Sequence, residues 1–117
     1  MMMENLKAQI RDRLTSIGFS KSENTWSRNI TQILPGGTIS INGQVMRQQD
    51  QKREIKLNVI ESYEFDITDL NNGNVDNCLM LRFEVFENGI ISTEYEINLY
   101  PTEFNLFNNI INKLFGI

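Results

Sequence analysis

Two runs of alternating apolar and polar residues between Cys78 and Leu99 form the clearest pattern in the sequence. The members that recur at every second position are Leu79, Leu81, Phe83 and Val85 in the first run, and Ile91, Thr93, Tyr95, Ile97 and Leu99 in the second. This period is typical of β-strands with one buried face. Asn88-Gly89 separates the runs and is a strong hairpin signal. The sequence therefore predicts a β-hairpin over this stretch.

Two loop lengths are compatible with this hairpin, and they give different registers. A two-residue loop at Asn88-Gly89 places Val85 opposite Ser92, so that an apolar face meets a polar one. A three-residue loop, Glu87-Asn88-Gly89 with its glycine left-handed, pairs Val85 with Ile91 and makes one face continuously apolar. Because a shift of one residue turns every side chain of a strand to the other face, we predict the three-residue loop.

An amphipathic helix is predicted directly after the hairpin. Its apolar stripe has helical spacing and comprises Phe104, Phe107, Ile111 and Leu114, widened by Ile110 and Phe115. Pro101 and Glu103 suit the first turn, where no amide hydrogen is needed and the helix dipole favours an acidic side chain. So wide a stripe predicts that the helix covers one face of a sheet.

The first half of the chain predicts another helix and further strands. Apolar residues recur at helical spacing at Met3, Leu6, Ile10, Leu14 and Ile17. Gly18 suits the left-handed position that ends such a helix. Alternation predicts strands over residues 26–33, 38–47 and 55–65, the last one bent near Glu61.

Turn residues indicate how these strands are connected. Leu34-Pro35-Gly36-Gly37 matches a type II turn, and the polar segment 48–52 is turn-like. Asn42-Gly43 fits either a bulge within one strand or a separate tight turn. Residues 66–77, rich in Asp, Asn and Gly, are expected to be the least structured. The predicted fold is α+β, an antiparallel sheet of four to five strands with an N-terminal and a C-terminal helix packed on one face.

The composition indicates one soluble domain spanning residues 1–117. The chain is 40% hydrophobic and 22% charged, and no apolar run approaches the ~18 residues of a membrane span. Residues 1–10 lack the apolar core of a signal peptide. Cys78 is the single cysteine, which excludes an internal disulfide and suits a reducing compartment. We expect a cytoplasmic protein.

Catalysis is not expected, because the chain contains no histidine. This absence removes the commonest general base, the usual activator of a nucleophile and a common metal ligand. Cys78 therefore lacks an imidazole to activate it. Glu84, Glu94 and Glu96 share the outward face of the hairpin, with Arg82 placed to neutralise Glu94, and we interpret them as a solvated surface. We expect no enzymatic activity, no metal and no cofactor.

The segment Asp69–Asp76 has the residue types of a calcium-binding loop but not their spacing. Gly73 stands at the fifth position instead of the sixth, and Met80 occupies the twelfth, where a bidentate glutamate is required. Asp and Asn are also ordinary turn residues. A plain loop is therefore the preferred interpretation, and cation binding there stays an open question.

One feature of the outward face favours contact with another protein. In the predicted register Phe86 faces Ile90 at the hairpin tip, and Met80 lies farther along the same face. A large aromatic residue beside isoleucine on a solvent face is typical of an interaction surface. Together with Glu84 and Glu94, these residues predict a non-enzymatic protein-interaction module with an acidic sheet surface. Such a module would act as an adaptor, as an inhibitor or as a homodimeric assembly protein.

Nucleic-acid binding through the basic segment 47–56 is the alternative. Its candidate residues are Arg47, Lys52, Arg53 and Lys56. Residues 1–56 carry a net charge of +4 and residues 57–117 one of −8. The acidic second half disfavours binding to a polyanion, and the sequence indicates no basic groove with exposed aromatic residues. Protein binding is therefore the preferred prediction.

Overall fold

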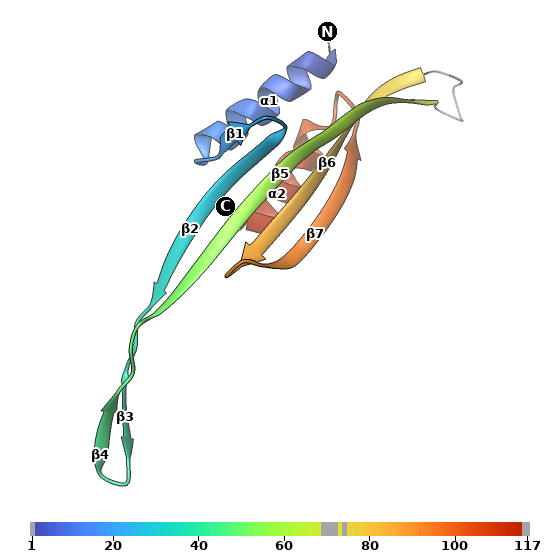
Figure 1. Ribbon diagram of the computed structural model, residues 1–117. Helices are drawn as coiled ribbons and strands as arrows, with labels where there is room; N and C mark the ends of the chain where they lie inside the picture. The colour runs from blue at the N-terminus through green and yellow to red at the C-terminus, as the bar shows by residue number, and fades with distance from the viewer. Residues whose placement is uncertain (1, 69–72, 74, 116–117) are drawn as a thin grey trace.

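The predicted α+β class is confirmed by the computed structural model, which describes residues 2–68, 73 and 75–115 (Figure 1). Its elements are α1 (Met2–Ser16), β1 (Ser20–Ser22), β2 (Thr25–Leu34), β3 (Thr38–Ile41), β4 (Gln44–Arg47), β5 (Gln51–Thr68), β6 (Val75–Glu87), β7 (Ile90–Leu99) and α2 (Phe104–Phe115). An antiparallel five-stranded sheet has the order β1-β2-β5-β6-β7, and β3 pairs with β4 separately.

Both helices pack on the same face of the five-stranded sheet, as predicted. Their contribution to the core comes from Met3, Leu6, Ile10 and Leu14 of α1 and from Phe107 and Ile111 of α2. The sheet contributes Trp26, Leu57, Val59, Leu79, Leu81, Phe83 and Leu99. Alternation along the strands and their register place these sheet residues on one side. We call the opposite side of the sheet the open face.

The end of α1 follows the predicted capping pattern. Gly18 has a φ of 91°. The Phe19 amide donates a hydrogen bond to the Leu14 carbonyl at 2.9 Å, and the Gly18 amide donates to the Thr15 carbonyl at 3.2 Å. These are the two bonds of a Schellman motif. Phe19 is itself a core residue, so the cap also anchors the chain where it enters β1.

The start of α2 differs from the prediction. Pro101 lies in a turn before the helix and not in its first turn, because α2 begins at Phe104. The Glu103 carboxylate accepts a hydrogen bond from the Tyr100 amide at 2.8 Å. The Glu103 amide donates to the Tyr100 carbonyl at 3.0 Å. Glu103 therefore fixes the turn between β7 and α2.

The loop of the β6–β7 hairpin corrects the predicted length. Glu87 pairs with Ile90, so the loop contains two residues and not three. Asn88 and Gly89 have φ values of 50° and 82°. Positive φ at both residues is the geometry of a type I′ turn, which matches the twist of the two strands. The left-handed Gly89 that the sequence predicts is confirmed.

A bulge next to this loop restores the apolar face. The register shifts between Val85 and Phe86, and Val85 pairs with Thr93 instead of the predicted Ile91. Ser92 is the extra residue, and its hydroxyl donates to the Val85 carbonyl at 3.1 Å. One inserted residue turns every later side chain of β7 over. The core face of the hairpin therefore stays apolar despite the shorter loop.

Strands β5 and β6 extend into the segment 66–77, which was expected to be the least structured. β5 reaches Thr68 and β6 begins at Val75, so both ends of this segment belong to paired strands. The bend predicted near Glu61 is confirmed as a register shift directly after that residue. The calcium-loop comparison over Asp69–Asp76 lies mostly outside the described residues.

The chain is strongly elongated. Its radius of gyration is 20.1 Å and its extents are 76 × 26 × 21 Å, whereas a compact domain of this length has a radius of gyration of about 13 Å. The ends of β2 and β5, together with β3 and β4, form a ribbon that projects away from the helices (Figure 1). We call residues 31–53 the arm and the rest of the described chain the body.

The arm corrects the predicted turn at Leu34-Pro35-Gly36-Gly37. Neither glycine has the positive φ that a type II turn requires, and the chain passes from β2 into β3 without reversing. The polar segment 48–52 is not a turn, because it runs back beside the segment 33–37. The reversal occurs at Asn42-Gly43, where φ is 51° and 82°. Of the two interpretations of this dipeptide, the tight turn is therefore right.

Candidate protein-interaction surface

The boundary between body and arm lies where β6 ends beside β5. The Asn88 amide donates to the Glu54 carbonyl at 2.8 Å, and the Asn88 side-chain oxygen accepts from the Glu54 amide at 2.9 Å. Asn88 thereby satisfies both backbone groups of Glu54, as the next residue of a strand would. Beyond this point, within the part of the chain that the structure describes, β5 pairs with β2 alone. The sheet narrows to two strands there.

A joint, defined as residues 35–37 and 48–50, interrupts the arm. The Gly36 amide donates to the Asp50 carboxylate at 2.7 Å. The two backbones approach so closely that a Cβ at Gly36 would overlap the Gln48 carbonyl. Glycine is required here for close approach and not for an unusual φ. The joint therefore links the distal hairpin to the body through a tight backbone crossing.

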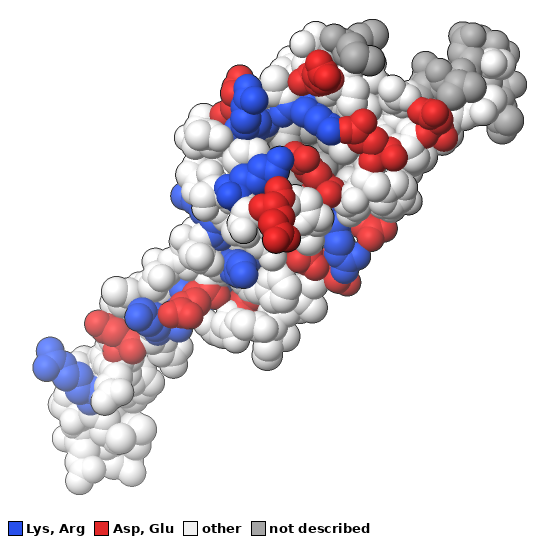
Figure 2. Space-filling model, turned by 45° about the horizontal axis from the view of Figure 1, so that its top comes forward, with Lys and Arg blue, Asp and Glu red and all other residues white. Residues whose placement is uncertain are grey.

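The arm is almost entirely exposed to solvent. Every residue from 31 to 52 except Gly36 is exposed, and the core contains no described residue of the arm. Eleven large apolar side chains of the described residues are exposed, and six of them lie in the arm: Ile33, Leu34, Ile39, Ile41, Val45 and Met46. The end of the arm, at the lower left of Figure 2, carries few charges. A two-stranded ribbon is only marginally stable in water, and an uncovered apolar area of this kind makes the arm the candidate interaction surface.

The distal hairpin of the arm is amphipathic. Ile39 pairs with Met46, and Ile41 lies two residues farther along the same side of the ribbon. Ser40 pairs with Val45 on the other side. We call Ile39, Ile41 and Met46 the apolar face of the arm. Val45 is the large apolar residue of the opposite face, and it is 73% exposed.

A row of polar side chains crosses four strands on the open face of the body. Ser27, Asn58, Glu84 and Glu94 pair in turn across β2, β5, β6 and β7. The Ser27 hydroxyl donates to the Asn58 side-chain oxygen at 2.8 Å, and the Asn58 amide donates to Glu84 at 3.3 Å. Asn58 is only 8% exposed, so these bonds satisfy a buried amide group. The row accordingly fixes the register of the sheet.

Arg82 holds the acidic side chains of the open face together. Its guanidinium donates to Glu96 at 2.8 Å and to Glu84 at 3.2 Å, and it forms an ion pair with Glu94. The hydrogen bonds to Glu96 and then to Glu84 raise the pKa of Arg82, since they favour its charged form. The predicted contact of Arg82 with Glu94 is present, although Glu96 is its direct partner in the register. One cation for three carboxylates leaves this cluster with a net negative charge.

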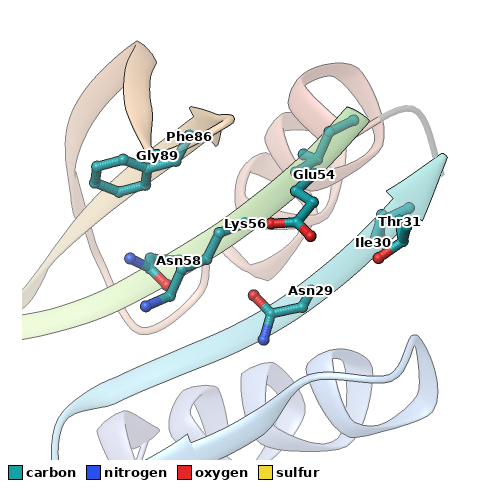
Figure 3. A pocket seen from close by; sticks show the side chains of 9 residues that line it. Asn29, Ile30, Thr31, Glu54, Lys56, Asn58, Phe86 and Gly89 are labelled. Atoms are coloured by element: carbon teal, nitrogen blue, oxygen red, sulfur yellow. The ribbon is translucent and has the colours of Figure 1, made fainter. Parts of the chain in front are cut away.

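An open pocket of about 590 Å³ lies at the root of the arm. Its lining includes Asn29, Thr31, Glu54, Lys56 and Phe86. Asn29, Lys56 and Phe86 pair directly across β2, β5 and β6, so they project from the open face, as Figure 3 shows. The pocket combines a half-buried aromatic wall with charges of both signs. We call it the root pocket.

The structure brings most of the predicted interaction residues together. Four of the five share the open face: Met80, Glu84, Phe86 and Glu94. Ile90 does not, because it pairs with Glu87 on the side of the helices, while Phe86 pairs with Ile91. The predicted outward pair of Phe86 and Ile90 is therefore wrong, since the two-residue loop shifts the register at the hairpin tip.

The four basic residues of the nucleic-acid alternative do not form one patch. Lys52 and Lys56 lie on the open face of β5. Arg53 lies on the other face and forms an ion pair with Glu87. Arg47 lies on β4, beyond the joint. The continuous basic groove that nucleic acid requires is thus not assembled from these four residues.

Sequence reasoning missed the apolar face of the arm. The signal that marks it is Asn42-Gly43, because the same dipeptide at residues 88–89 correctly indicated a hairpin.

The thiol of Cys78 is fully buried. Across residues 2–68, 73 and 75–115, no group of three or more Cys, Asp or Glu side chains is arranged to hold a metal ion.

Comparison with known proteins adds no family to this picture. No protein-family model, curated protein or solved structure matches the chain. Neither of the two helices that the structure describes combines the length and the apolar character needed to cross a membrane. The arm and the open face are therefore the features of the chain that bear on its function.

Proposed function

We propose that this protein is a small non-enzymatic interaction module that binds another protein chain through its arm. The observation that carries the proposal is the apolar face of Ile39, Ile41 and Met46, exposed on a ribbon outside the core. Removing such apolar area from water is the main driving force of protein association. The acidic cluster of Glu84, Glu94 and Glu96 on the open face is the second surface, and it selects the partner by charge.

The energy available from the apolar face supports a specific but modest contact. Full burial of a large apolar side chain contributes about 1.5–3 kcal/mol. Ile39, Ile41 and Met46 are 39%, 53% and 56% exposed, so about half of that contribution is still to be gained. Covering all three therefore contributes roughly 2–4 kcal/mol. Ile33 and Leu34 extend the same arm and add to this gain.

We propose no enzymatic role for this protein. The Cys78 thiol is buried, and the three glutamates of the open face are engaged by Arg82. General acid–base catalysis needs a proton-transfer group within reach of a substrate, and these groups serve the sheet instead. We propose a cytoplasmic location, because a single thiol suits a reducing compartment.

The proposal is tested by comparing two faces of the same hairpin. The tagged protein, an Ile41→Ser/Met46→Ser variant and a Val45→Ser control are used to capture proteins from the lysate of the native host. Captured chains, including further copies of this protein, are quantified by mass spectrometry. We expect capture to be lost in the double variant and kept in the control, whose altered residue lies on the opposite face.

The thermal midpoint of all three proteins should be the same, because no described arm residue belongs to the core. Equal capture by the apolar-face variant and the parent protein would refute the role of the arm. Loss of capture that accompanies a large fall in the midpoint would refute the separation between arm and body.

A further inference from the structure

We infer that the partner of this protein supplies an extended, acidic segment that pairs as an added strand with the free edge of β2, along residues 28–34. This edge runs from the body into the arm, so the inference rests on the proposed function and names the chemistry of the partner of the arm. The apolar face of Ile39, Ile41 and Met46 can bind a partner without this edge, so the two proposals can fail separately.

The outer side of β2 is free along most of the strand. β1 pairs only with residues 25–27. Within the described part of the chain, no strand pairs with the same side of residues 28–34. In Figure 1 this half of β2 has β5 on one side and no element on the other. Residues 29 and 31–34 are exposed, so the edge is open to an added strand.

The backbone groups that face this edge belong to Asn29, Thr31 and Ile33. Glu54 directs its amide and its carbonyl to Asn88, on the side away from β2. Two directly opposite residues of an antiparallel pair either exchange both hydrogen bonds or direct both groups outward. Thr31 is the register partner of Glu54, so its N–H and C=O point to the free edge. The groups of Asn29 and Ile33 follow at the same period and complete a ladder of donors and acceptors for β-strand addition.

This edge lacks the charges found at other free edges of the sheet. Charged side chains commonly prevent unwanted pairing of edge strands. They are Glu94 and Glu96 of β7, Glu64 and Asp66 of β5 beyond its pairing with β2, and Lys52 and Arg53 of β5 beyond its pairing with β6. Residues 29–34 are Asn, Ile, Thr, Gln, Ile and Leu, with no charge and no proline. An edge without this protection suits pairing with another chain.

Cations without an internal partner flank the same edge. Lys52 and Lys56 lie on the open face of β5, beside β2, and Arg28 lies on β2 on the side of the helices. None of the three takes part in an ion pair within the described residues. Glu54 lies between the two lysines, so three cations and one anion give this strip a net charge of +2. An acidic segment complements this charge.

The same charges disfavour a second copy of this protein at the edge. Two paired β2 strands would bring Arg28, Lys52 and Lys56 of both copies together, and like charges repel. The acidic cluster around Arg82 does not oppose an acidic strand here, because it lies on β6 and β7, beyond β5. Three strand spacings, roughly 14 Å, separate the added strand from β6 and exceed the Debye length of about 8 Å near physiological salt.

The first measurement compares synthetic peptides as probes. A capped peptide that matches residues 28–34 in length and alternates valine with glutamate is titrated into the protein by calorimetry. Its dissociation constant should be at least about tenfold lower than that of a valine–lysine peptide of equal length. N-methylation of the central amides of the glutamate peptide removes the donors of strand pairing and should weaken binding at least about tenfold. This comparison requires no change in the protein.

The second measurement locates the bound peptide by amide hydrogen exchange, followed by NMR. The glutamate peptide should slow exchange at Asn29, Thr31 and Ile33 at least about tenfold, because their amide hydrogens become hydrogen-bonded. Exchange at Glu94 and Glu96, in the edge strand β7, should stay unchanged.

The third measurement uses variants with matched controls. Thr31→Pro removes a donor that faces the free edge and not β5, so it should weaken peptide binding at least about tenfold at an unchanged thermal midpoint. Asn98→Pro places the same residue in the edge strand β7 and should keep the dissociation constant within about twofold. Lys52→Glu/Lys56→Glu should abolish the preference for the glutamate peptide. Lys113→Glu, on the exposed side of α2, should retain it.

Tighter binding of the glutamate peptide, sensitive to N-methylation and with slowed exchange at Asn29, Thr31 and Ile33, supports the inference. Exchange that slows at β7 instead overturns it, and so do equal affinities for the two peptides. Self-association that protects the same three amides in the absence of peptide would identify a second copy as the occupant and also overturns it.

Lysate capture separates the inference from the proposed function. A protein that binds neither peptide, yet loses capture on Ile41→Ser/Met46→Ser, overturns the inference and leaves the proposed function standing. Absence of peptide binding together with capture that this variant does not change overturns both. Peptide pairing at β2 with unchanged capture by the variant supports the inference and overturns the role of the apolar face.

Discussion

Replacing Asn88 with alanine should destabilise the body, whereas the same change at Asn42 should not. Both residues open an Asn-Gly turn, and their φ values are nearly equal, 50° and 51°. They differ in their surroundings. The Asn88 side chain accepts a hydrogen bond from the Glu54 amide at the boundary of the body. Asn42 lies at the tip of the arm, where every neighbouring residue is exposed.

The expected magnitude follows from two contributions at Asn88. Alanine in the left-handed region costs about 1 kcal/mol more than a residue that tolerates it. Loss of the hydrogen bond to Glu54 costs about another 1 kcal/mol. Asn88→Ala should therefore lower the free energy of unfolding by about 2 kcal/mol. Asn88→Gly keeps the backbone conformation accessible and loses only the hydrogen bond, so it should cost about half as much.

Urea denaturation followed by tryptophan fluorescence measures these differences. Trp26 is the single tryptophan and a core residue, so its emission reports unfolding of the body. Asn42→Ala should shift the free energy by less than about 0.3 kcal/mol, because a local change in the arm is invisible to this probe. An effect of Asn42→Ala equal to that of Asn88→Ala would refute the separation of arm and body. Indistinguishable values for Asn88→Ala and Asn88→Gly would refute the backbone contribution.

Four further outcomes are expected. Gly36→Ala should weaken capture of proteins by the arm, because its Cβ would overlap a carbonyl across the joint; Gly37→Ala, whose Cβ meets nothing within 4 Å, should leave capture unchanged. The Cys78 thiol should resist Ellman's reagent in the native protein and react in urea, and rapid native labelling would contradict its complete burial. Arg82→Gln should lower the thermal midpoint, because the three carboxylates around it then repel each other without a cation. Added salt screens this repulsion and should reduce the loss; a salt-independent loss would argue against repulsion. Oligonucleotides should bind weakly or not at all in fluorescence anisotropy near physiological salt, and a micromolar, strongly salt-dependent affinity would revive the nucleic-acid alternative.

The hairpin register shows what alternation along a strand can and cannot determine. The sequence predicts correctly that Leu79, Leu81, Phe83 and Val85 share the core face. It does not predict their partners, because a three-residue loop and a two-residue loop with one bulge differ by two residues in register. A shift of two keeps every side chain on its face. The hydrophobic pattern therefore supports both registers equally, and the bulge at Ser92 decides between them.

The arm escaped prediction for a related reason. Ile39, Ile41 and Val45 indicate strands by their spacing, but spacing does not reveal whether a neighbouring element covers the apolar face. Pro35 and Gly36 also suggest a chain reversal by composition, whereas Gly36 is needed for close approach to Gln48. A glycine can be required because it adopts positive φ or because it has no side chain, and the sequence alone does not show which of the two applies. Only the structure shows that Gly36 lies against the backbone of residues 48–49 and that the lack of a side chain is the property used.

The division of β5 explains how one chain can hold a stable body and an uncovered arm together. Its central part, residues 55–60, lies between β2 and β6 and contributes Leu57 and Val59 to the core. Its N-terminal part loses β6 at Glu54 and continues as an exposed ribbon. Folding of the body thus does not depend on covering the arm, so the apolar area of the arm is left to stabilise association. Substitutions in the arm should change binding at constant stability, and substitutions around Leu57 should change stability first. A variant of the apolar face that lowers both together would show that the two parts fold as one cooperative unit.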